Sequence, residues 1–388
     1  MKTDRVIIEP TAPRLELRCA SDIPMSAIRW LWPGWLARGK FHLLAGPPGV
    51  AKTTIAMHFA AIVSAGLDFP DGTFSKAGNV LIWSGEDDPA DTLVPRLRAA
   101  GADLNRVYFV GDMSAGDAFR SFDPATDIPA LLEQAIRIGG VSLIVVDPIV
   151  SAVAGDSHKN GEVRRALQPL VDMADRIGAA VVGITHFSKG TTGRDPTERV
   201  TGSVAFGALA RVVMVAAKAS GGEHGSERIL ARAKSNVGPD GGGFGYTVEQ
   251  VDAGDGIEAS RISWGATLDG TAHELLGRAD AASEAKDADE AAAFLRALIS
   301  SGVQESKTIF REAESAGLSH DQIKRAKVRI GAKAFKVSMD GGWIWKLPQF
   351  EGSAQEAEGS TQNRPLPSTP SPRRSLRASR VDTSERPA

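Results

Sequence analysis

The sequence has little cysteine and no long apolar run. Cys19 is the single cysteine among 388 residues, so the chain cannot form an internal disulfide framework, and a reducing compartment is expected. No window holds eighteen consecutive apolar residues, and residues 1–6, MKTDRV, lack the apolar core of a secretory signal. We therefore expect a cytoplasmic protein that is neither membrane-bound nor exported.

The sequence also lacks a strong charge of either sign. Its 45 Lys and Arg against 47 Asp and Glu give a formal net charge of −2, so any surface that attracts a polyanion must be local. With 42% hydrophobic and 24% charged residues, the composition is typical of a globular protein. The length predicts two domains rather than one.

The most informative segment that is present is residues 41–54, FHLLAGPPGVAKTT. It predicts a buried strand, a glycine turn and the start of a helix, which is the layout of a nucleotide-phosphate site. Lys52 can reach the β- and γ-phosphate oxygens, and the Thr53 hydroxyl can bind Mg²⁺. The expected ligands are thus ATP and Mg²⁺. The predicted nucleotide-binding residues are Gly46, Pro47, Pro48, Gly49, Val50, Ala51, Lys52, Thr53 and Thr54.

One residue departs from the usual pattern of this turn, because Ala51 stands where G-x-x-x-x-G-K-[ST] has its last glycine. If the backbone needs a positive φ at this position, the Cβ costs about 1 to 2 kcal/mol. Such strain would weaken the site without removing a group that contacts phosphate.

Apolar strands alternate with helical patterns from about residue 40 to 235. This order predicts an α/β fold with a mostly parallel central sheet and helices on both faces. A hairpin over 246–264 is expected to close the sheet. The expected strands are 79–84, 107–110, 142–147, 180–185, 211–217 and 228–234, and the helices between them are 91–100, 128–138 and 162–177.

Hydrolysis needs further groups, and each has a candidate at the carboxyl end of a predicted strand, where open parallel sheets bind ligands. Asp147 can join the Mg²⁺ shell beside Thr53, although it is also an ordinary strand-end residue. Glu86, in the turn GEDD, can polarise the attacking water, with Asp87, Asp88 or a merely solvated acidic turn as alternatives. His186 can sense the γ-phosphate, unless it is merely packed.

These motifs together resemble a RecA-superfamily hexameric ATPase, and within it the RepA-type replicative helicases of plasmids, phages and integrated elements. The resemblance covers roughly residues 20 to 240. It rests on the segments GPPGVAKTT, LIWSGEDDP, SLIVVDP, GITHFSKG and GSVAFGALARVV, in this order. It implies a RecA-like P-loop fold and a homo-oligomeric ring, usually of six subunits, with single-stranded DNA through the middle.

The resemblance also implies that a basic residue of one subunit completes the ATP site of its neighbour. Arg211, in ALARVV, is the first candidate for this arginine finger, with Arg232 and Lys234, in ARAKSN, as second candidates. A salt bridge at the strand start is the plainer interpretation of Arg211.

The segment 187–207 is basic, polar and interrupted by glycine, as a loop that grips a nucleic-acid backbone should be. Lys189, Arg194 and Arg199 are its candidate DNA contacts, and an ordinary surface loop is the alternative. A shorter segment, 151–163, is a second candidate for the pore.

A smaller domain is expected over 288–348, with three helices and a hairpin that resemble a winged helix-turn-helix. Lys324, Arg325 and Lys327 lie on its third helix and are candidate contacts to duplex or origin DNA. The alternative is a solvated charged face on a protein-binding module.

The expected organisation is an N-terminal extension 1–24, an ATPase core 25–265, a linker or solvated helix 266–287, the small domain 288–348 and a disordered Ser/Pro/Arg tail 349–388. Trp30, Trp32 and Trp35 are expected to pack rather than to stack on adenine. The sequence favours an ATP-dependent DNA helicase. A DNA-binding regulatory ATPase that switches oligomeric state without unwinding is the alternative, and a signalling ATPase is a weaker one.

Overall fold

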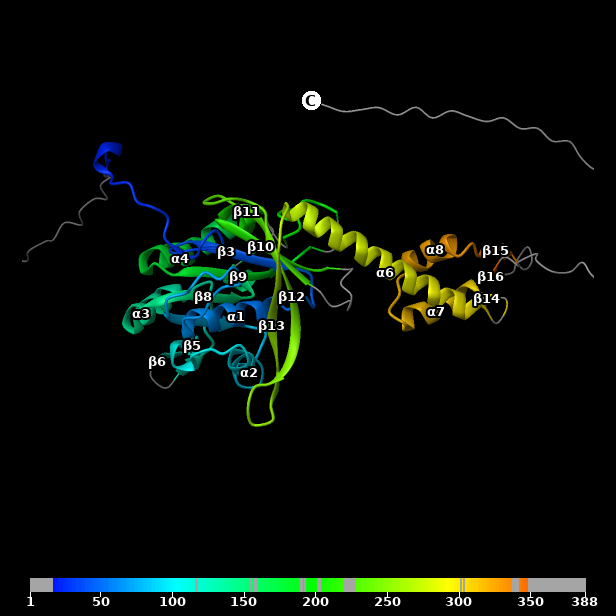
Figure 1. Cartoon of the computed structure of the whole chain (residues 1–388), viewed down its shortest axis with the longest axis horizontal. Helices are drawn as coiled ribbons and strands as arrows, with labels where there is room; N and C mark the ends of the chain where they lie inside the picture. The colour runs from blue at the N-terminus through cyan, green and yellow to red at the C-terminus, as the bar shows by residue number, and fades with distance from the viewer. Residues whose placement is uncertain are drawn as a thin grey trace, which may run out of the picture.

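A nine-stranded sheet organises the larger part of the computed structural model (Figure 1). The structure describes residues 17–115, 118–153, 155–156, 159–188, 191, 193–200, 204–219, 228–300, 302, 304–336 and 342–347. In sheet order the strands are β13 Glu258–Leu268, β12 Gly243–Asp252, β11 Arg228–Ser235, β10 Val212–Lys218, β3 Phe41–Gly46, β9 Ala180–His186, β8 Val141–Asp147, β4 Asn79–Ser84 and β5 Val107–Phe109. The strands from β10 to β5 are parallel, and β11, β12 and β13 continue the sheet antiparallel. The predicted mostly parallel α/β sheet and its closing hairpin are confirmed.

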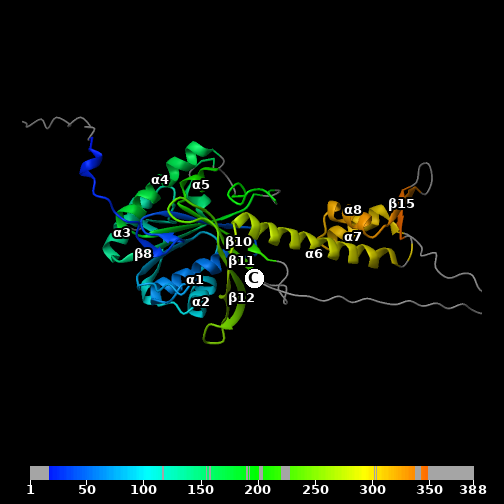
Figure 2. The same cartoon turned by 45° about the horizontal axis from the view of Figure 1, so that its top comes forward.

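Helices cover both faces of this sheet (Figures 1 and 2). Alternate residues of a strand point to opposite faces, so Leu44 of β3 packs in the core under α1 Lys52–Ala65 and α2 Val94–Ala99. Leu43 packs in the other core, under α3 Ile128–Ile138 and α4 Asn160–Ile177. The strands are apolar on both faces because both faces are buried. The turn after β3 is thereby held between two rigid layers.

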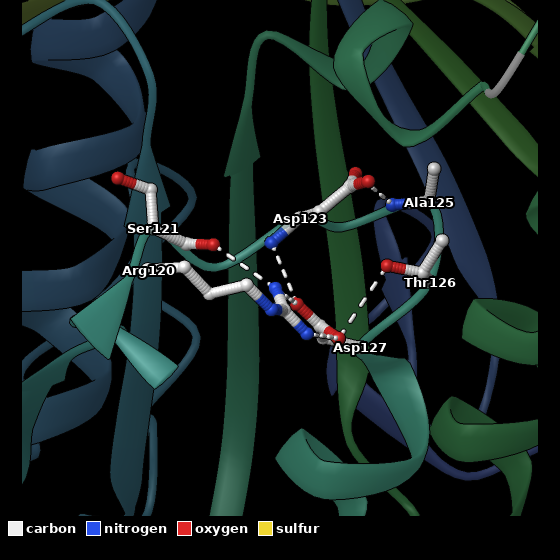
Figure 3. Close-up of polar contacts among 6 residues, drawn as sticks. All are labelled: Arg120, Ser121, Asp123, Ala125, Thr126 and Asp127. Carbon is white, nitrogen blue, oxygen red and sulfur yellow. Dashed lines mark hydrogen bonds and ion pairs between the residues drawn. The ribbon is translucent and has the colours of Figure 1, made fainter. Parts of the chain in front are cut away.

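The segment before α3 is held together by one buried carboxylate, shown in Figure 3. Asp127, only 7% exposed, precedes the helix and accepts two hydrogen bonds of 2.6 and 2.7 Å from the Arg120 guanidinium. It also accepts the backbone N–H of Asp123 at 2.9 Å. The hydrogen bonds from Arg120, followed by that from Asp123, lower the pKa of Asp127 to about 2. Arg120 ends β7 Ala118–Arg120, which pairs with β6 Met113–Ala115 in a hairpin that the sequence did not predict.

The tryptophan-rich segment forms a small hairpin, β1 Trp30–Trp32 and β2 Leu36–Ala37, against the α1 face of the sheet. Trp32 is fully buried and stacks on Trp35 and on Phe69, with ring centroids 4.8 Å apart in each pair. Its indole N–H donates to Asp71 at 2.9 Å. The expectation that Trp32 and Trp35 pack is confirmed, whereas Trp30 is only half-buried.

The remaining described elements of this larger part, up to β13, are short turns and one short helix. They are the 3-10 turns Ala20–Asp22, Leu104–Arg106 and Ile149–Ala152, the π-helical turn Pro89–Leu93, and α5 Val204–Leu209.

A second, smaller unit lies at the far end of helix α6 Ala272–Ser300 (Figure 1). At its start α6 packs Leu275 and Leu276 into the core of the large sheet, and near its end Leu295 and Ile299 join a separate core. That core also contains α7 Ser306–Ser315, α8 His320–Arg329 and the sheet of β14 Gln304–Glu305, β16 Trp343–Lys346 and β15 Lys333–Lys336. Of the segment 266–287, predicted as a linker or a solvated helix, residues 266–268 end β13 and residues 272–287 are helical without a break.

Helix α8 begins with a capping box at Ser319. Ser319 accepts the backbone N–H of Gln322, and the Gln322 side chain accepts the backbone N–H of Ser319. This reciprocal capping box satisfies two backbone donors that the first helical turn leaves open. Among the described residues, no helix combines the length and the apolar character that crossing a bilayer requires. The predicted tail 349–388 and residues 1–16 lie outside the described residues.

Candidate ATPase site

The backbone at Ala51 in the phosphate turn has the positive φ that the sequence analysis considered. Ala51 immediately precedes α1 in the left-handed region, with φ 61° and ψ 39°, and Gly49 has φ 77°. A residue with a Cβ therefore occupies a conformation that favours glycine, and the strain expected of Ala51 is present. The turn is also held tightly to the sheet, because a Cβ on Gly46 would lie 2.3 Å from the Ala216 carbonyl oxygen.

Lys52 begins α1 and points back into this turn. Its Nζ donates to the carbonyl oxygens of Gly46 and Pro47, each at 3.0 Å, and lies 3.2 Å from Nδ1 of His186. Burial lowers the pKa of Lys52 to about 8, against the opposing charges of Asp147 and Glu86. The ammonium group is therefore charged at neutral pH and is held where a phosphate would exchange for the two carbonyl oxygens.

Thr53 and Asp147 meet directly, as the sequence predicted. The Thr53 hydroxyl donates to the Asp147 carboxylate at 2.7 Å across the space between α1 and β8. Burial raises the pKa of Asp147 to about 6, and the negative charges of Glu86 and Asp87 act in the same direction. A buried carboxylate beside a hydroxyl is a donor set that fits Mg²⁺, which binds one or two protein oxygens together with water and substrate phosphates. When bound, the cation would offset the phosphate charge.

The three carboxylates of the acidic turn after β4 differ in their contacts. Asp87 forms an ion pair with Arg96 at 2.9 Å, and Asp88 caps the following turn by accepting the N–H groups of Ala90 and Asp91. Glu86 is exposed, and among the described residues it forms neither a hydrogen bond nor an ion pair. Its charge acts on Lys52, Asp147 and His186. Glu86 is therefore the carboxylate of this turn that is left for an incoming water.

His186 lies at the carboxyl end of β9, directly beside Gly46 of β3 in the strand register. Burial, followed by the charge of Lys52, lowers its pKa below the usual value. The imidazole is therefore neutral at pH 7, and Nδ1 accepts from the Lys52 ammonium when Nε2 carries the proton. A phosphate that draws Lys52 away would break this contact, which is the change a γ-phosphate sensor requires.

Arg211 lies at the amino ends of the parallel strands, whereas this cluster lies at their carboxyl ends. Its backbone N–H donates to the Phe41 carbonyl oxygen at 2.8 Å, at the amino end of β3. The five-residue rise from Phe41 to Gly46 separates Arg211 from the phosphate turn by about 16 Å along the strand. Its side chain is exposed. Arg211 can therefore assist an ATP site only if that site belongs to another subunit.

The second candidates for the arginine finger are engaged within the chain. The Arg232 guanidinium donates to the Gly34 carbonyl oxygen at 2.9 Å and lies over the Trp35 ring, 4.9 Å from its centroid. Arg232 is only 9% exposed. Lys234 donates to the carbonyl oxygen of Gly207 at 2.8 Å. This burial argues against Arg232 as the finger, because a finger must extend from the surface of its own subunit.

The candidate DNA loop is described only in part. Arg199 is 6% exposed, and its guanidinium lies 4.5 Å from the centroid of the Phe187 ring. It packs at the base of the loop, and this burial leaves little of its side chain open to a DNA backbone. Arg194 is exposed, as that role requires. Lys189 lies outside the described residues.

The candidate DNA contacts of the C-terminal unit differ in whether they face solvent. Lys324 and Arg325 are exposed on α8, opposite the buried Ile323 and Ala326. Lys327 instead lies over the Trp345 ring at 4.8 Å from its centroid, which ties α8 to β16. Lys324 and Arg325 are therefore the two predicted contacts that face solvent without such packing.

One supporting residue was missed by the sequence reasoning. The hydroxyl of Tyr246, on β12, donates to the Val50 carbonyl oxygen at 2.6 Å and is fully buried. It fastens the phosphate turn to the antiparallel part of the sheet. The chain has only two tyrosines, but nothing in the local pattern of 243–252 indicates which distant carbonyl this one would reach.

Comparison with known proteins agrees with the geometry. Residues 11–192 match a family described as AAA domain, and this range holds the phosphate turn, Glu86, Asp147 and His186. No curated protein matches the chain. Arg211 and the C-terminal unit lie beyond the matched range. The family match and the cluster of Lys52, Thr53 and Asp147 together support one conclusion, that the chain carries a P-loop ATPase domain.

Proposed function

We propose that this chain is an ATP-dependent DNA helicase or translocase of a plasmid, phage or integrated element, which hydrolyses ATP at the subunit interfaces of a ring. The proposal is carried by the separation of Arg211 from the cluster of Lys52, Thr53, Asp147 and Glu86. One chain places its phosphate-binding groups at one edge of the sheet and its exposed arginine at the other. An enzyme arranged in this way is completed by a neighbour.

Each residue of the cluster has a defined task in this proposal. The Lys52 ammonium binds the β- and γ-phosphates, while Thr53 and Asp147 hold the cation. Glu86 orients water for attack and accepts its proton. His186, released from Lys52 as the phosphate binds, passes the change at the site to the loop that begins at the next residue, Phe187. The exposed Arg194 of that loop would contact the phosphates of single-stranded DNA.

The discriminating experiment measures ATP hydrolysis with and without single-stranded DNA, together with unwinding of a forked duplex. A helicase should show turnover that rises with single-stranded DNA and strand separation that needs ATP. The Glu86→Gln variant should keep ATP affinity and lose about 100-fold or more in turnover. Asp87→Asn is the matched control, because Asp87 is paired with Arg96 and its loss should leave most turnover. A normal rate in Glu86→Gln would remove Glu86 from its role.

The exposed basic face of α8 fits the proposed helicase and equally the alternative function, a DNA-binding regulatory ATPase that switches oligomeric state without unwinding. Both functions use duplex binding by the C-terminal unit, which we propose to act as a winged helix with α8 against the DNA. Duplex binding with turnover that DNA does not stimulate, and no strand separation, would favour the regulator.

Duplex binding by the C-terminal unit has its own test. Replacing Lys324 and Arg325 with alanine should weaken binding at every sequence and lower the slope of log affinity against log salt by about 2. Lys307→Ala, on the exposed side of α7, is the control. An unchanged slope in the double variant would assign the α8 face to a protein partner instead.

A further inference from the structure

A cavity of about 680 Å³ opens at the edge of the sheet opposite the ATPase site. It lies among the amino ends of the parallel strands: Arg38 precedes β3, Lys76 precedes β4, residues 140–142 begin β8, and residues 175–178 end α4 before β9. Strands of six or seven residues put it about 20 Å from the phosphate turn. No step of ATP hydrolysis proposed above uses this cavity.

The lining of the cavity is strongly basic. Arg29, Arg38, Lys76 and Arg176 face it, against a single carboxylate, Asp175. That carboxylate is already paired with Lys40 at 3.1 Å. Within the part of the chain that the structure describes, none of the four basic side chains forms an ion pair. Four cations around one cavity repel one another, so an anion placed among them would be stabilised.

Two of these cations are held by contacts with the rest of the fold, Arg38 half-buried and Arg29 exposed. Arg38 is half-buried and donates to the hydroxyl of Ser142, itself 7% exposed, at 3.2 Å. The Arg38 backbone N–H donates to the Arg29 carbonyl oxygen at 2.7 Å, which holds the two arginines side by side. The Arg29 guanidinium also lies against Gly178, where an added Cβ would be 3.3 Å from its Nη2. Burial, followed by the charge of Arg29, lowers the pKa of Arg38.

An aromatic ring completes the lining. Trp30 is half-buried, lines the cavity and rests against Gly238 on one side. A flat indole beside guanidinium groups is suited to a ligand that combines a planar base with phosphates. The volume falls within the range of small-molecule sites, about 300 to 1,000 Å³, which favours a compact ligand over a continuous strand.

We propose that this cavity, formed by Arg29, Trp30, Arg38, Lys76 and Arg176, is a second anion site that binds a compact ligand with two or more phosphates, such as a nucleoside di- or triphosphate. Arg29, Arg38 and Arg176 hold the phosphates, and Trp30 stacks on the base. The site is separate from the phosphate turn. It would let the chain respond to a nucleotide that it does not hydrolyse.

The test counts binding sites on the full chain by calorimetry. The unsubstituted chain should bind two ATP molecules, and Lys52→Ala should retain one. In the Lys52→Ala background, replacing Arg29 and Arg176 together with alanine should weaken the remaining binding about 100-fold, or ten-fold for each lost charged contact. Arg164→Ala is the matched control, because Arg164 is exposed on α4 and lies about 18 Å along that helix from Arg176.

Two further probes identify the ligand. Tripolyphosphate should compete with ATP for the site in Lys52→Ala. If the base stacks on the indole, Trp30→Ala should weaken the binding of ATP but not that of tripolyphosphate. Equal weakening of both would show that the site recognises the polyphosphate alone and would overturn the stacking role of Trp30. A thermal melt of each variant checks that it is folded.

Several outcomes would overturn the proposal. One is a Lys52→Ala chain that binds neither ATP nor tripolyphosphate, or binds them with an affinity that the arginine substitutions do not change. Another is an oligo-dT strand that binds through Arg29 and Arg176 and is not displaced by tripolyphosphate. ATP hydrolysis should persist in the Arg29→Ala, Arg176→Ala chain, so a failure here and a failure of the proposed ATPase function are separate results.

Discussion

At the residue scale, the strain at Ala51 has a measurable size. Ala51 is partly buried with φ 61°, whereas Ala130 has similar burial inside α3. Glycine removes one methyl group and adds chain entropy at both sites, so the difference between them isolates the left-handed conformation. We expect Ala51→Gly to leave the protein more stable than Ala130→Gly by about 1 to 2 kcal/mol. Urea unfolding of both variants measures this, and equal destabilisation would contradict it.

The buried carboxylate Asp127 predicts a specific acid dependence of stability. The pKa of Asp127 is about 2 in the folded protein, against 3.8 for an aspartate without these hydrogen bonds. As pH falls, the unfolded chain therefore binds this proton first. The stability that Asp127 contributes is therefore complete above about pH 4 and is lost between about pH 4 and pH 2. Asp127→Asn should flatten the fall in unfolding free energy over this window.

The control for Asp127 is Asp269→Asn, which removes an exposed carboxylate outside the cluster of Figure 3. It should leave the acid limb of the stability profile as it is in the unsubstituted chain. If the two variants lose stability in parallel as pH falls, the hydrogen bonds from Arg120 do not fix the Asp127 charge.

At the scale of the element, helix α8 depends on its capping box. Ser319→Ala removes the side-chain acceptor for the Gln322 N–H, and such losses cost about 1 kcal/mol. Hydrogen exchange of the α8 amides should accelerate about five-fold for that energy. Ser306→Ala, at the start of α7 where no side chain caps the helix, is the control. Equal acceleration of both helices would indicate that the cap is not what holds α8.

The continuity of helix α6 could not be predicted from the sequence. Residues 279–289 are rich in Ala, Asp and Glu with no large apolar side chain, so their composition allows either a linker or a solvated helix. The ends of α6 carry Leu275 and Leu276 on one side and Leu295 and Ile299 on the other. Packing at both ends extends one helix through the stretch between them, and composition of the middle alone does not reveal it.

At the scale of the whole molecule, the opposite placement of Lys52 and Arg211 predicts complementation. Chains carrying Lys52→Ala or Arg211→Ala should each be inactive. In the ring that we propose, a mixture of the two chains contains interfaces where the first chain supplies the arginine and the second supplies the lysine, and random assembly makes about a quarter of interfaces of this kind. Mixing should therefore restore up to about a quarter of the ATPase rate.

The matched control mixes Lys52→Ala with Glu86→Gln. Both substitutions lie on the same side of the interface, so every mixed site keeps one defect and no activity should return. Restoration in this pair, or its absence with Arg211→Ala, would contradict action of Arg211 in trans.

The sequence by itself determined the alternation of strands and helices, the phosphate turn and the carboxyl-end positions of Glu86, Asp147 and His186, because these depend on periodicity and local spacing. Only the tertiary structure decided which basic residues are available. Arg199 and Arg232 look like exposed contacts in the sequence, yet each guanidinium packs on a ring, Phe187 or Trp35, from another segment. The Tyr246 anchor and the basic cavity arise in the same way. They join residues that are far apart along the chain, and burial and distance between such residues are set by packing, which local pattern does not encode.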